Sequence, residues 1–134
     1  MRSGERATVS APDVRALSVA SGLGRLAIGV GIFAAPRTTF SLLGFRDLDD
    51  AGMTVARLAG ARDIVLAVGT LLALDDPGRL RAASLASAAA DGGDAISFAL
   101  LLGRSPESDA ARRGIAAAVP ATLAGLWVAS RLRD

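Results

Sequence analysis

The sequence predicts an all-α protein, an antiparallel bundle of four transmembrane helices formed by residues 1–134 as a single domain. Two observations lead to this prediction: 51% of the residues are hydrophobic, and turn-forming residues divide the chain into four apolar stretches of similar length. These stretches cover residues 12–36, 51–74, 77–103 and 109–132. Alanine and leucine dominate them and no long alternation of β-branched residues occurs, so helix is favoured over strand.

Each stretch begins with a recognisable helix-start signal. The signals are capping residues, prolines at the first helical position and acidic first turns, and they lie at Ser10–Asp13, Asp47–Asp50, Asp76–Pro77 and Ser105–Pro106. The links between the stretches are short, so consecutive helices should be antiparallel. Between the first two stretches, residues 38–45 (TTFSLLGF) are apolar and are expected to lie at an interface.

The placement of polar residues favours a lipid environment. In the third stretch Ser84, Ser87, Asp91 and Asp94 fall within an arc of about 80°, whereas a water-exposed helix is polar over most of its surface. Residues 114–130 contain no charge at all. Each stretch also exceeds the roughly 20 residues needed to cross a bilayer core. A soluble, alanine-rich bundle stays open as an alternative, because the uncharged runs at 26–36 and 64–74 are only 11 residues long.

Composition excludes several chemistries. The chain has no Cys or His, which removes disulfides, thiolate nucleophiles, Ser-His-Asp triads and the usual zinc ligands. Any metal site would need carboxylates, and we predict neither a metal nor a cofactor. The net charge is only +2, so nucleic acid is not an expected partner.

The arginines predict the location and orientation of the chain. Every basic residue is Arg, and with abundant Ala this composition is typical of a GC-rich bacterial genome. Seven arginines flank the side of the bundle that holds both termini, and five flank the other side. The positive-inside rule therefore predicts a multi-pass protein of the cytoplasmic membrane with both termini in the cytoplasm.

Five charged residues interrupt the apolar stretches at similar depth: Arg25, Arg62, Asp63, Asp91 and Asp94 each lie about 11 to 15 residues into a stretch. Unpaired at the bilayer centre, each would cost about 2.5–3.5 kcal/mol, so they are expected to bury against one another. Arg57 would balance the charges at three against three, although its position also lets it reach the membrane interface.

Three functions follow from this cluster. In the first, it forms one end of a cavity for a small, largely apolar ligand with a polar or anionic end, bound by Arg25, Arg57, Arg62 and Asp63. In the second, Asp91 and Asp94 are catalytic: two close carboxylates do not readily both ionise in low dielectric, so one carries a proton in an isomerisation or cyclisation. In the third, the charges only set helix packing. The expected partners are the lipid bilayer, the ligand and a second copy of the chain.

Several motifs carry a resemblance to a known group of proteins. They are Phe40–Phe45 (FSLLGF) after a helix that ends at Pro36, Arg57–Gly69 (RLAGARDIVLAVG), and Ala90–Asp94 (ADGGD). In these features the chain resembles small bacterial four-helix integral membrane proteins of unknown function that are grouped loosely with the DoxX-like proteins. The resemblance covers most of the chain and implies a four-helix membrane fold. It implies no established activity.

Overall fold

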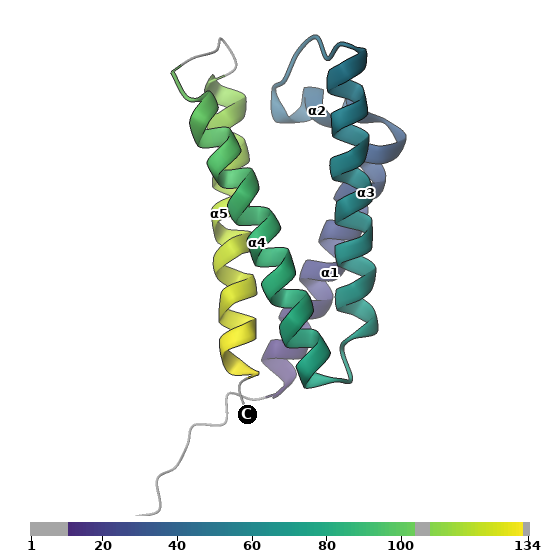
Figure 1. Cartoon of the computed structure of the whole chain (residues 1–134), viewed down its shortest axis with the longest axis vertical. Coiled ribbons are helices and arrows are strands. Elements are labelled where there is room, and N and C mark those ends of the chain that lie inside the picture. Colours follow the sequence, from purple (N-terminus) through teal and green to yellow (C-terminus); the bar gives the residue numbers. More distant parts are fainter. Residues whose placement is uncertain (1–10, 104–107, 133–134) are drawn as a thin grey trace, which may run out of the picture.

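The computed structural model describes residues 11–103 and 108–132, and these residues are almost entirely helical. The helices are α1 (Ala11–Ala34), α2 (Pro36–Leu43), α3 (Asp50–Leu72), α4 (Pro77–Leu101) and α5 (Ser108–Arg131). The all-α prediction is confirmed. Consecutive long helices run antiparallel, so both ends of the described chain lie at the end of the molecule that also holds the α3–α4 link (Figure 1).

Helix α2 is a departure from the predicted pattern, in which the first helix ended at Pro36 and residues 38–45 formed a loop. The backbone leaves the helical conformation at Ala35 (φ −135°, ψ 65°), and Pro36 then starts a new helix. Proline suits this position because it lacks the N–H that a first turn leaves unpaired. Helix α2 ends at Gly44, whose φ of 94° favours glycine, and the Gly44 N–H donates to the Ser41 carbonyl.

Two of the predicted helix starts are confirmed by capping hydrogen bonds. Asp49 caps α3 by accepting from the backbone N–H of Gly52 at 2.7 Å. Asp76 caps α4 by accepting from the N–H of Arg79 at 3.0 Å, with Pro77 at the first helical position. The signals at Ser10 and at Ser105–Pro106 lie outside the described residues.

The four long helices pack as two pairs, α1 with α3 and α4 with α5. Glycines allow the close approach within each pair: a Cβ on Gly60 of α3 would lie 2.8 Å from the Gly29 carbonyl oxygen of α1, and one on Gly125 of α5 would lie 3.0 Å from the Ser84 carbonyl oxygen of α4. Between the pairs, the Cα atoms of α1 and α4 stay more than 8 Å apart. The predicted bundle is thus shown only in part, because the pairs diverge toward the α2 end (Figure 1).

The interior is built mainly from small side chains, and many of the large apolar ones lie outside. Most buried hydrophobic residues are alanines, and in the described part of the chain no large side chain is fully buried. Exposed aliphatic residues occur on every helix, among them Leu23, Leu42, Val65, Leu100 and Leu123. Two helical segments, Pro12–Ala34 and Ser108–Arg131, are long and apolar enough to cross a membrane.

Candidate functional site

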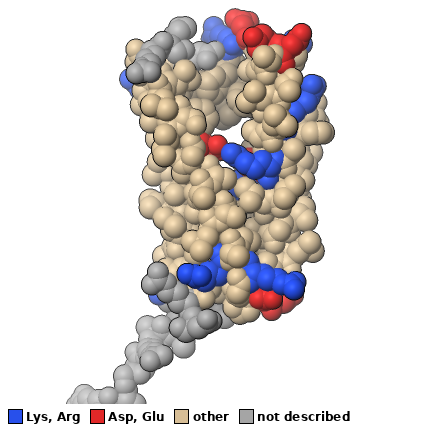
Figure 2. Space-filling model, in the orientation of Figure 1, with Lys and Arg blue, Asp and Glu red and all other residues tan. Residues whose placement is uncertain are grey.

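A cleft of about 420 Å³ lies between the two helix pairs, and all five helices contribute to its lining. Its wall is largely apolar, with Ala, Gly, Ile, Leu and Phe residues from all five helices. Figure 2 shows an opening between the two halves of the molecule, with acidic and basic side chains at its edge about midway along the length. The volume falls within the range of small-molecule sites.

The charged side chains of the cleft form one continuous series of ion pairs, Asp91–Arg25–Asp63–Arg62–Asp94, which we call the ion-pair chain. Arg25 donates from Nη1 to Asp63 Oδ1 at 3.0 Å and from Nη2 to Asp91 Oδ2. Arg62 donates to Asp63 Oδ1 from Nη2 at 3.1 Å. It also holds both oxygens of Asp94, at 2.9 and 2.7 Å. This bidentate geometry is the strong form of an Arg–carboxylate contact.

The ion-pair chain connects the two helix pairs. Arg25 of α1 contacts α3 through Asp63 and α4 through Asp91, while Arg62 of α3 contacts α4 through Asp94. The Arg25 end is the more deeply buried: 11% of the Arg25 side chain and 10% of the Asp91 side chain are exposed, against 37% for both Arg62 and Asp94. The Arg62–Asp94 pair is therefore the more exposed end of the ion-pair chain.

The charges within the ion-pair chain do not balance. Three aspartates face two arginines, which gives a formal charge of −1. All three guanidinium nitrogens of Arg62 already donate to carboxylates. By contrast, Asp63 Oδ2 and Asp91 Oδ1 accept no hydrogen bond from the described part of the chain. Two buried carboxylate oxygens of this site are thus available to a hydrogen-bond donor.

Aromatic rings close the opposite end of the cleft. Phe40 of α2 packs on Phe45 with ring centroids 5.6 Å apart, and Phe45 packs on Phe98 of α4 at 6.0 Å. Gly114 of α5 makes room for Phe98, because a Cβ there would lie 2.5 Å from the ring. The predicted apolar loop at 38–45 thus becomes a wall of the cleft, and its FSLLGF sequence was the only signal for this role.

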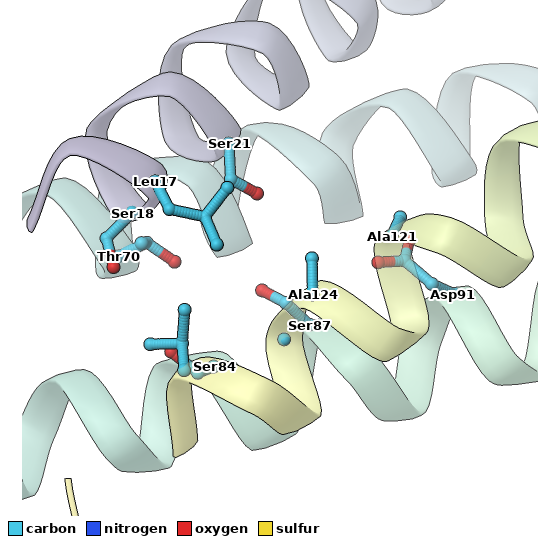
Figure 3. Close-up of a pocket in the computed structure, with 11 residues that line it drawn as sticks. Leu17, Ser18, Ser21, Thr70, Ser84, Ser87, Asp91, Ala121 and Ala124 are labelled. Carbon is cyan, nitrogen blue, oxygen red and sulfur yellow. The ribbon is translucent and has the colours of Figure 1, made fainter. Parts of the chain in front are cut away.

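A second, much smaller cavity of about 20 Å³ lies on the other side of the ion-pair chain. Figure 3 shows its lining: Ser18 and Ser21 of α1 and Thr70 of α3 face Ser84 and Ser87 of α4 across a narrow space. This volume suffices for about one water-sized molecule. Asp91 lines both cavities, together with Ser21 and Ala121.

The structure brings together five of the six residues that sequence analysis selected. Arg57 is the exception, because it is exposed on α3, does not line the cleft and has no ion pair in the described part of the chain. The two aspartates proposed as catalytic share one helix but pair with different arginines, Asp91 with Arg25 and Asp94 with Arg62. No group of three or more described acidic side chains is placed to hold a metal ion.

Comparisons with protein-family models, with curated proteins and with solved structures find no significant match to this chain.

Proposed function

We propose that this chain is an integral membrane protein whose cleft binds a small, largely apolar ligand, with the polar end of the ligand at the ion-pair chain. The single observation that carries the proposal is an apolar cleft of about 420 Å³ that ends on buried charges. The DoxX-like resemblance fits this architecture.

The distribution of apolar side chains supports the membrane part of the proposal. In each of the two candidate spans, only 22% of the most apolar 18-residue segment is buried inside the protein. The core helix of a soluble protein would be mostly buried. The four long helices have 23 to 25 residues, which corresponds to about 35–38 Å and exceeds the roughly 30 Å hydrocarbon core. Charges on the viewed face gather mostly at the two ends and at the cleft (Figure 2).

Helices α3 and α4 carry four of the five ion-pair chain residues, and this pairing supports their insertion into lipid. Arg62 and Asp63 come from α3 and Asp91 and Asp94 from α4. Each of these side chains is bonded to an opposite charge, which lowers the cost of placing it in hydrocarbon. We accordingly propose four spans with both termini in the cytoplasm.

The geometry favours binding over catalysis. Asp91 and Asp94 each accept hydrogen bonds from a guanidinium, which is the arrangement of an acceptor that orients arginine and not of an acid that donates a proton. A purely structural ion-pair chain would not require the cleft beside it. Tight packing of the two pairs along their whole length would serve that role better, because filled interiors are the rule in proteins.

The membrane part is tested by alkaline carbonate extraction of the untagged protein. We expect the protein to stay in the membrane pellet and to be released only by detergent. Release into the carbonate supernatant would contradict the proposal, and the ion-pair chain would then be the core of a soluble bundle.

Ligand binding is tested with radiolabelled decanol, using protein in phosphatidylcholine nanodiscs and empty nanodiscs as background. We expect saturable binding, and we expect Gly24→Leu to abolish it. Gly24 lines the cleft, and a Cβ there meets nothing within 4 Å, so the larger side chain fills the cleft without a clash at its Cβ. Gly93→Leu is the matched control, because Gly93 also has open space but does not line the cleft. Equal binding by the two variants would place the ligand elsewhere.

A further inference from the structure

We infer that the cleft selects ligands with a cationic, ammonium-type end, so that its ligands are lipophilic amines and not fatty acids or other lipophilic anions. This inference rests on the proposed function, because it names the chemical class of the ligand that the cleft binds. It also revises the sequence-based expectation of a polar or anionic end bound by Arg25, Arg57, Arg62 and Asp63.

The first argument is the charge of the ion-pair chain. The expected balance of three against three depended on Arg57, and the structure leaves Arg57 exposed and outside the cleft. Three aspartates and two arginines carry a formal charge of −1. A net charge in a low-dielectric interior is strongly unfavourable unless an opposite charge lies beside it. A bound cation supplies that charge, whereas an anion would raise the imbalance to −2.

The second argument is the hydrogen bonding that remains unused. An anionic headgroup would need arginine as its partner, but each arginine of the cleft already pairs with two aspartates, Arg25 with Asp63 and Asp91 and Arg62 with Asp63 and Asp94. An anion would therefore compete with carboxylates for both guanidinium groups. An ammonium group is a donor without acceptor capacity. It would find two acceptors, Asp63 Oδ2 and Asp91 Oδ1. Both residues line the cleft, and neither of these two oxygens accepts a hydrogen bond from the described chain.

The third argument is burial. About nine-tenths of the Asp91 side chain is buried, and Asp63 is nearly as enclosed. Both residues line the cleft, and little of either side chain is open to bulk water. A carboxylate oxygen in such a place is a strong site for a charged donor, because charge-assisted hydrogen bonds strengthen as water is excluded. The apolar wall between this point and the three phenylalanines then accommodates the alkyl part of the ligand.

The test compares three ligands with the same ten-carbon chain: decylammonium, decanol and decanoate. Binding is measured by equilibrium dialysis at pH 7 against protein in uncharged phosphatidylcholine nanodiscs, with empty nanodiscs as background. We expect the Kd of decylammonium to be at least about tenfold lower than that of decanoate, with decanol between them.

Two failures of this experiment are distinguishable. Decanoate binding as tightly as decylammonium, or decanol matching decylammonium, would overturn the inference while leaving the proposed cleft in place. Absence of saturable binding by all three compounds would overturn the proposed function itself.

Charge variants separate selectivity from structural damage. Asp94→Asn makes the ion-pair chain neutral, and Arg62→Gln makes it −2. We expect the first to weaken decylammonium binding about tenfold and the second to tighten it by a similar factor. The double variant restores −1, and we expect it to bind like the wild type. It also removes both members of one pair, so it keeps the inference testable if Asp94→Asn alone does not fold.

Arg57→Gln is the matched control for Arg62→Gln. It removes the same charge from the same helix but from a position outside the cleft, and we expect it to leave the Kd unchanged. An equal loss of affinity in Arg62→Gln, Asp94→Asn and the double variant would overturn the inference, because structural damage alone predicts that pattern.

Discussion

Arg25 of α1 donates a hydrogen bond to Asp91 of α4, although the Cα atoms of these two helices stay more than 8 Å apart. The contact is possible because arginine has the reach to cross the space between the two helix pairs. The same guanidinium holds Asp63 of α3 at 3.0 Å. One side chain is thus bonded to both pairs, and the cleft lies beside it where α1 and α4 stay apart.

The two arginines of the ion-pair chain should differ in their importance for stability. Arg25→Met leaves the deeply buried Asp91 without an ion-pair partner in the described chain and removes one of the two partners of Asp63. We expect it to lower the free energy of unfolding by about 3–5 kcal/mol. Arg62→Met should cost less, roughly 1–2 kcal/mol, because the Arg62 and Asp94 side chains are 37% exposed and solvent screens the lost pair. Denaturant titration in detergent micelles measures both values. An equal or reversed order would contradict the central role of Arg25.

The crossing of α1 and α3 depends on Gly60. A Cβ at this position would lie 2.8 Å from the Gly29 carbonyl oxygen and 2.8 Å from the Phe33 nitrogen. Because both atoms belong to the backbone, Gly60→Ala should push the helices apart and destabilise the protein by about 1–3 kcal/mol. Gly69→Ala on the same helix is the control, since a Cβ there meets nothing within 4 Å. It should stabilise the helix by about 0.5–1 kcal/mol. The same titration compares them, and similar effects would refute the close crossing.

Gly114 controls the shape of the aromatic end of the cleft. Gly114→Ala places a Cβ 2.5 Å from the Phe98 ring, so the ring must move, and it can move into the cleft that it lines. Because the displaced ring would partly fill the site, we expect the Kd of decanol to rise about tenfold. Adding Phe98→Leu removes the clash and should restore binding. Failure of this rescue would show that Gly114 does not act through Phe98.

The orientation of the chain is testable by cysteine labelling, because the chain contains no Cys. Single cysteines replace the exposed Ser41 of α2 and Gly78 at the start of α4, and these two helix segments lie at opposite ends of the molecule (Figure 1). In intact cells a membrane-impermeant maleimide should label Ser41→Cys at once and Gly78→Cys only after permeabilisation. The reverse pattern would place both termini outside, and labelling of both sites in intact cells would argue against four spans.

Part of the fold was predictable because it depends on local signals. Asp49 and Asp76 cap helices whose starts could be located from single residues, since a capping bond forms within one turn. Helix α2 was missed because residues 36–43 are too short for apolar periodicity to distinguish a helix from a loop. The packing of the long helices as two pairs also could not be predicted from local sequence signals. Small residues are frequent throughout the chain, so they do not specify which glycines meet.

The sequence by itself determined that the charges near the middle of the helices had to meet, because isolated charges in an apolar chain are too costly. It therefore selected Arg25, Arg62, Asp63, Asp91 and Asp94 correctly as neighbours. Only the tertiary structure decided that Arg57 stays outside, that the remaining charge is −1 and that an apolar cleft adjoins it. The reason is geometric: depth along a helix follows from residue count, but the direction a side chain faces depends on which helix packs against which.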